Sequence, residues 1–157
     1  MEKGMSLRDA LPEREQVSFC RQILDAFDIA KQADIRTYSP LALAFLGDAV
    51  YSLVIRTAVV SRGNRQAEKL HRETSQLVCA KGQAAIGDAI REFLTGEEQA
   101  VYKRGRNANP YHRAKNATAE EYLKATALEA LCGYLYLRGE TERMLELIRL
   151  GREKAGL

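Results

Sequence analysis

Cysteine and histidine are scarce in this 157-residue chain, which has three cysteines and two histidines. Cys20, Cys79 and Cys132 lie far apart within apolar helical patterns, and neither a CxxC spacing nor a histidine cluster accompanies them. Structural zinc sites and disulfide frameworks depend on such groupings. We therefore predict reduced, mostly buried thiols, with neither a disulfide nor a zinc site.

Three further signals are absent. The apolar runs fall short of the roughly eighteen residues that indicate a membrane-spanning helix. The N-terminus, Met1–Asp9, has no apolar secretory core, which a signal peptide requires. No stretch alternates at period two for long, and β-branched runs are few, so strands are not expected. These absences predict an all-α, soluble, cytoplasmic protein with no membrane partner.

The length and the 46% hydrophobic content suit one globular domain with a real core. Within it, apolar residues at helical spacing predict a first amphipathic helix over residues 13–27. We expect residues 1–38 to form an N-terminal extension carrying that helix, and residues 39–157 to form the main helical domain. Further helices are expected over residues 40–62, 67–79, 84–94, 97–103, 118–138 and 140–154.

Two of these helices are apolar segments that each contain one acid. Residues 40–55 carry only Asp48, and residues 125–137 carry only Glu129. Removing a lone carboxylate from water costs on the order of several kcal/mol. Such a group is usually paired with a cation, bound to a metal, or placed at the wall of a cleft. Each acid therefore needs a partner.

The residue pattern leaves two explanations open for the acids. If the two helices pack with Asp48 facing Glu129, the carboxylates could hold one Mg²⁺ and direct a metal-bound water at a phosphodiester. Alternatively, each acid forms a structural ion pair with an arginine such as Arg56 or Arg138. Gly47 and Gly133 stand beside the acids inside the helices, where glycine is unfavourable, which indicates close helix packing or close approach of a ligand.

The positive charge is concentrated in one place. Residues 101–118 contain five basic residues and no acid, and the net charge of the whole chain is only +3. These residues are Lys103, Arg104, Arg106, Arg113 and Lys115. A local basic patch is the electrostatic pattern of a phosphate-binding surface. The segment 105–117 is predicted to be a loop, and Asn107 within it could contact phosphate, sugar or base. The alternative is that this basic segment is only a solvated surface.

The sequence Ala44-Phe45-Leu46-Gly47-Asp48-Ala49-Val50 resembles the signature helix of the ribonuclease III family. Leu128-Glu129-Ala130-Leu131, followed by Gly133, resembles the second acidic motif of that family. The closer resemblance is to the mini-ribonuclease III branch, a catalytic domain without a double-stranded-RNA-binding domain. It extends to His71 with Ser75, to Val78–Ala84 and to Lys103–Ala108, and the end of the chain at Leu157 leaves no room for the extra domain.

This resemblance implies that residues 39–157 are a ribonuclease III-type catalytic domain in which Asp48 and Glu129 bind Mg²⁺ and catalyse cleavage. It implies a homodimer that cuts both strands of double-stranded RNA, leaving 5′-phosphate and 3′-hydroxyl ends. The substrate class it implies is the structured precursor of large-subunit (23S) ribosomal RNA. We expect the basic segment, with His71 and Lys81, to contact the RNA.

Two family positions differ in this chain. The acid that usually precedes Phe-Leu-Gly-Asp is Ala44, and the aspartate that usually stands three residues before the second glutamate is Thr126. These changes predict weaker or more water-mediated metal binding. Two other function classes therefore stay open: a non-catalytic RNA-binding module that kept the fold, and a helical protein-interaction domain whose basic loop meets an acidic partner.

Overall fold

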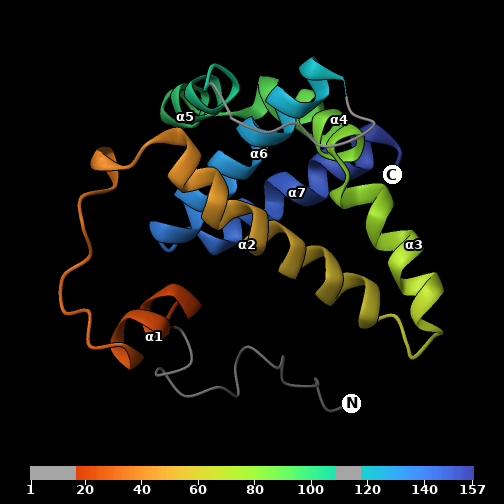
Figure 1. Cartoon of the computed structure of the whole chain (residues 1–157), viewed down its shortest axis with the longest axis horizontal. Helices are drawn as coiled ribbons and strands as arrows, with labels where there is room; N and C mark the ends of the chain where they lie inside the picture. The colour runs from red at the N-terminus through yellow and green to blue at the C-terminus, as the bar shows by residue number, and fades with distance from the viewer. Residues whose placement is uncertain (1–16, 109–117) are drawn as a thin grey trace, which may run out of the picture. The chain divides into compact units, whose positions relative to one another are not determined.

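The computed structural model describes residues 17–108 and 118–157 (Figure 1). Within these ranges the secondary structure consists of helices and turns, without strands, which confirms the all-α prediction. The chain divides into two compact units, Met1–Ala33 and Asp34–Leu157.

The first unit contains helix α1, Phe19–Ala26, which is shorter than the predicted helix over residues 13–27. Ser18 caps it, because its side chain accepts a hydrogen bond from the backbone N–H of Arg21. Cys20 is buried, whereas Phe19 and Phe27 are exposed. The spacing of the apolar residues predicts an amphipathic helix, and Cys20 is the one residue of α1 that the structure buries.

The second unit is a bundle in which α6 lies among α2, α4 and α5 (Figure 1). The most extensive contact joins α2 to α6, and α7 packs mainly on α4. The elements in chain order are η3 (Ile35–Thr37), α2 (Pro40–Val60), α3 (Ala67–Val78), α4 (Ala80–Ile90), η4 (Arg91–Phe93), α5 (Gly96–Arg106), α6 (Ala119–Leu137) and α7 (Thr141–Ala155). The two apolar helices of the sequence thus form the centre of the unit.

Local capping explains where these helices begin. The Ser39 hydroxyl accepts a hydrogen bond from the N–H of Ala42 at 3.1 Å, and Pro40 occupies the first helical position, as predicted. Thr118 caps α6 in the same way, through the N–H of Glu121. Cys79 caps α4, where its Sγ accepts from Gly82 at 3.4 Å. This cap starts α4 at Ala80, four residues before the predicted start.

The predicted start of the loop at residue 105 is wrong. Helix α5 continues to Arg106, so Gly105 and Arg106 are helical and not the start of a loop. The reason is tertiary, because Gly105 packs on α6, and a β-carbon there would lie 2.9 Å from the Cα of Ala127. The rest of the predicted loop, from residue 109, lies outside the described residues. In the chain as a whole, Cys20 and Cys132 are buried and Cys79 is exposed, which agrees with the prediction of mostly buried thiols.

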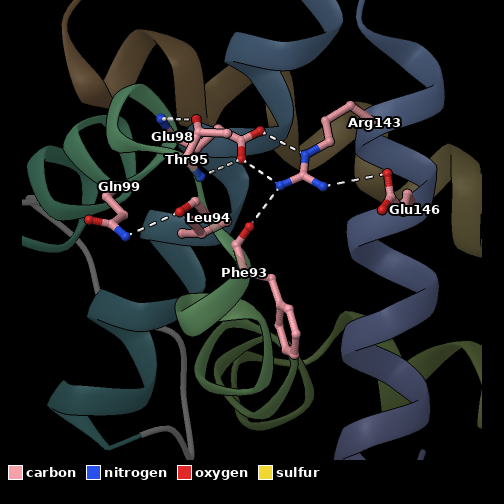
Figure 2. Close-up of polar contacts among 7 residues, drawn as sticks. All are labelled: Phe93, Leu94, Thr95, Glu98, Gln99, Arg143 and Glu146. Carbon is pink, nitrogen blue, oxygen red and sulfur yellow. Dashed lines mark hydrogen bonds and ion pairs between the residues drawn. The ribbon is translucent and has the colours of Figure 1, made fainter.

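A buried ion pair fixes α7 to the start of α5 (Figure 2). Glu98 is 5% exposed and completes a capping box with Thr95. Its carboxylate accepts hydrogen bonds from Arg143 Nε at 3.0 Å and Nη2 at 2.8 Å. Arg143 Nη2 also donates to the carbonyl oxygen of Phe93 at 2.8 Å. Hydrogen bonding to Arg143 lowers the pKa of Glu98, so this carboxylate is ionised at neutral pH.

Helix α2 is longer than the sixteen-residue apolar run that the sequence shows. Its 21 residues reach a mean hydropathy of 1.6, and by length and composition alone it could cross a membrane, unlike the other described helices. Soluble proteins contain core helices that pass the same test, and α2 packs on α6 along one face. Its opposite face is exposed, with Phe45 at 85%, Leu53 at 53% and Val60 at 57%.

Candidate active site

The candidate active site lies where α2 and α6 approach each other most closely. A β-carbon added to Gly47 would lie 1.7 Å from the backbone carbonyl oxygen of Glu129. One added to Gly133 would lie 2.1 Å from the carbonyl oxygen of Leu43. Only glycine permits such an approach of two backbones. The two glycines therefore place Asp48, next to Gly47, beside Glu129.

The two acids line one hollow of about 430 Å³. Ala44 and Thr126 line the same hollow, so the two positions at which the family usually has further acids do face this space. The Thr126 hydroxyl donates a hydrogen bond to the carbonyl oxygen of Tyr122 at 3.0 Å. The remaining lining residues are Leu41, Phe45, Leu46, Ala49 and Tyr122. The hollow thus offers two carboxylates among small and apolar side chains.

The electrostatics of the site come from these two acids. Asp48 is exposed and Glu129 is half-buried. Burial, and then the neighbouring Asp48 carboxylate, raise the pKa of Glu129 to about 8, and a hydrogen bond from the Gln83 side chain opposes that rise. A carboxyl with such a pKa is mostly protonated at neutral pH. The site is therefore short of positive charge, and a cation between the two acids would favour the ionised form.

The alternative of structural ion pairs is not found. Within the described ranges neither acid forms a salt bridge with a basic side chain. Arg56 donates to the Ser52 hydroxyl at 3.1 Å, and Arg138 pairs with Glu140 at 3.0 Å. In the same ranges no group of three or more histidine, cysteine, aspartate or glutamate side chains is placed to hold a metal. Any metal here would rely on two protein carboxylates.

Gln83 is a residue of this site that the sequence did not single out. Its side chain is 2% exposed and hydrogen-bonds to the Glu129 carboxylate from α4. The neighbouring Gly82 packs closely on α3, where an added β-carbon would lie 2.1 Å from the carbonyl oxygen of Gln76. Gln83 falls within the segment 78–84 that resembles the mini branch. That signal marks the segment but does not show which side chain faces the acid.

The predicted RNA-contacting residues are spread over three helices. Lys103 and Arg104 are exposed in the last turns of α5. His71 is exposed on α3, and Lys81 is exposed in the first turn of α4. None of these four lines the hollow that contains the acids. They are available at the surface, but the structure does not join them to the acids in one cavity.

Arg106 and Asn107 lie at the end of α5. Arg106 is half-buried, and its Nη2 lies 3.5 Å from a Glu120 carboxylate oxygen. Asn107 is exposed and is the C-cap residue of α5. The remaining two predicted contacts, Arg113 and Lys115, lie outside the described residues. The structure therefore places six of the eight predicted contact residues and leaves two untested.

Comparison with known proteins agrees with this arrangement. The ribonuclease III domain family matches residues 41–140. The mini-ribonuclease 3 of Thermoanaerobacter sp. is 42% identical over 127 residues, covering 81% of this chain and 89% of that protein. The mini-ribonuclease 3 of Enterococcus faecalis is 44% identical over 125 residues, covering 78% of this chain and 95% of that protein.

A solved structure shows the same fold. The crystal structure of a protein from Fusobacterium nucleatum superposes with a TM-score of 0.70 at 36% sequence identity, covering 78% of this chain and 94% of that chain. The matched family segment contains both acids, both crossing glycines and Gln83. The chain therefore belongs to the ribonuclease III family of endoribonucleases, in its mini-ribonuclease III branch.

Proposed function

We propose that this chain is a Mg²⁺-dependent endoribonuclease that cleaves double-stranded RNA to leave 5′-phosphate and 3′-hydroxyl ends. The observation that supports it most is the pair of acids, Asp48 and Glu129, which line one hollow without a basic partner among the described residues. Two adjacent carboxylates without a counter-ion form a site of the kind that hard divalent cations occupy. Family membership supplies the reaction class.

The residues present fit a magnesium ion. Mg²⁺ prefers carboxylate oxygens, commonly uses one or two of them, and takes its other ligands from water and substrate phosphate. When bound, it would lower the pKa of a water and stabilise negative charge on the phosphate. Asp48 and Glu129 would hold the ion, and Gln83 would orient Glu129. Ala44 and Thr126 add no carboxylate, so this site leaves more positions to water.

We further propose that the active form is a homodimer built on the exposed face of α2. Phe45, Leu53 and Val60 make that face apolar, and apolar surface of this kind indicates a contact with another protein. Phe45 also lines the hollow that contains the acids. A two-fold contact through this face would therefore bring two hollows together, one for each RNA strand.

RNA recognition in this proposal depends on shape and charge. Double-stranded RNA presents a wide, shallow minor groove between two phosphate backbones. The exposed cations Lys103, Arg104 and Lys81 suit contacts with those backbones. The resemblance to the mini branch supports the structured precursor of 23S ribosomal RNA as the substrate. The cytoplasm is the location that we propose for this activity.

The test is cleavage of an end-labelled RNA duplex in Mg²⁺ and in EDTA. We expect cutting that requires Mg²⁺ and that is lost in Asp48→Asn and in Glu129→Gln. Glu153→Gln, which removes one exposed carboxylate from α7, is the matched control and should cut normally. Thermal melting of each variant checks that the fold is intact.

One observation favours a second candidate, a non-catalytic RNA-binding module. Ala44 and Thr126 remove two of the carboxylates that the family usually places around this hollow. The same experiment separates the two candidates. If the natural chain binds the duplex in Mg²⁺ but does not cut it, the endonuclease proposal is wrong and the binding module is favoured.

A further inference from the structure

A second hollow, of about 410 Å³, lies along η4 and α5 and shares no lining residue with the hollow that contains the acids. We call it the α5 pocket. Its lining residues are Arg91, Leu94, Gln99, Tyr102, Lys103, Arg106 and Asn107. Three of these seven side chains are basic and none is acidic. Its volume lies within the range of small-molecule sites, enough for a phosphate with its attached ribose.

The positive charges of the α5 pocket are poorly compensated. Within the described part of the chain, Arg91 and Lys103 form no salt bridge. Arg106 has a single ion pair there, and its 3.5 Å distance to Glu120 is long. Cations that converge on one space repel one another. A bound anion would remove that repulsion.

Two buried donors beside the α5 pocket have no acceptor among the described residues. Tyr102 is 2% exposed, and in residues 17–108 and 118–157 neither its hydroxyl nor the Nε of Arg106 has a hydrogen-bond partner. An unsatisfied buried donor destabilises the free chain. Both atoms are covered in the free chain, and the Arg91 guanidinium lies over the Tyr102 ring at 5.6 Å. The Tyr102 hydroxyl lies on the α4 side, where a β-carbon added to Gly87 would be 2.7 Å from it. It is therefore not a contact for a ligand in the pocket.

We propose that the α5 pocket is a phosphate-binding subsite that holds one backbone phosphate of the RNA, away from the acids. This inference rests on the proposed RNA substrate. Arg91, Lys103 and Arg106 supply the charge, and an arginine can donate two hydrogen bonds to one phosphate. Contacts of this kind fix the register of a duplex without reading its sequence. Arg91 lies outside the basic segment that the sequence indicates.

The first experiment uses inorganic phosphate and the natural chain, followed by NMR of the backbone amides. We expect saturable shifts at Arg91, Tyr102 and Lys103, which Arg91→Gln weakens several-fold. Tyr102→Phe should bind phosphate as the natural chain does, because the hydroxyl is covered and lies against α4. If Arg91→Gln gives the same shifts as the natural chain, the subsite is overturned.

The second experiment measures RNA binding. A labelled duplex is titrated with chain carrying Asp48→Asn, to prevent cutting, at several salt concentrations. Adding Arg91→Gln should lower affinity several-fold and reduce the slope of log affinity against log salt by about one, the value for one lost phosphate contact. Arg149→Gln removes an exposed charge from α7 and is the matched control for net charge.

The outcomes are separable. Phosphate shifts together with the reduced salt slope support the subsite. Equal behaviour of Arg91→Gln and Arg149→Gln overturns it, and phosphate shifts without any effect on RNA would make the pocket a free-phosphate site instead. Failure of the natural chain to bind or cut RNA would overturn the proposed function and the RNA subsite together, while the phosphate titration would still report whether the pocket binds an anion.

Discussion

Replacing Gly47 with alanine should separate α2 from α6 and disable the site. The added β-carbon would lie 1.7 Å from the Glu129 carbonyl oxygen and 2.8 Å from the Gly133 backbone N. Since β-carbons are essentially never closer than 3.0 Å to another heavy atom, the helices must move apart by about 1 Å or more. Both obstacles are backbone atoms, so no side-chain rotation can relieve the clash.

Two opposing free energies decide whether Gly47→Ala stabilises or destabilises the fold. Alanine in a helix interior gains about 1 kcal/mol over glycine. Forcing extra volume into a packed core costs typically about 1–3 kcal/mol and occasionally more, and here the clash is with backbone. We therefore expect Gly47→Ala to lower the free energy of unfolding by about 2 kcal/mol. Activity should fall further than stability, because the displacement separates Asp48 from Glu129.

The assay is urea unfolding followed by circular dichroism, with duplex cleavage measured on the folded variant. Gly96→Ala is the control, because Gly96 is also helical and a β-carbon there meets nothing within 4 Å. It should be neutral or slightly stabilising and fully active. If Gly47→Ala proves as stable and as active as Gly96→Ala, the close crossing does not build the site and this reasoning is wrong.

Three further perturbations test the Glu98–Arg143 ion pair, the hydrogen bond that supports Glu129, and the proposed dimer. Arg143→Met leaves the Glu98 carboxylate buried without its cation and should cost about 2–4 kcal/mol at pH 7. Because Arg143 lowers the pKa of Glu98, the pair stabilises the fold at pH values above the usual carboxyl pKa. The difference in unfolding free energy between Arg143→Met and the natural chain should therefore shrink below about pH 4. A difference that stays constant down to pH 2 would contradict this. Gln83→Met removes the hydrogen bond to Glu129 at similar volume and should lower kcat and Mg²⁺ affinity by about tenfold or more, with KM for RNA little changed. Gln22→Met, which loses only a bond to a backbone carbonyl far from either hollow in sequence, should change none of these. Phe45→Glu should leave the fold of the single chain intact by circular dichroism, because Phe45 is 85% exposed there, but should give monomers in sedimentation and little cleavage.

The sequence determined the helices and the two acids by itself. Ser39-Pro40 and Thr118 start α2 and α6 as predicted, because a cap acts within its own turn and needs no distant partner. Asp48 and Glu129 could also be identified from local sequence alone, since each is the single charge in an apolar segment. The paired glycines beside them indicated a close approach, and the structure confirms it.

Tertiary structure alone decided which surfaces these helices share. Periodicity shows which residues lie on one face of a helix but not which partner covers that face. Gly105 therefore stays helical against α6, Gln83 reaches Glu129 from α4, and Arg91 joins Lys103 at the α5 pocket, although none of these relations is local. The exposure of Phe45 has the same origin, because α6 covers only one face of an almost uniformly apolar helix.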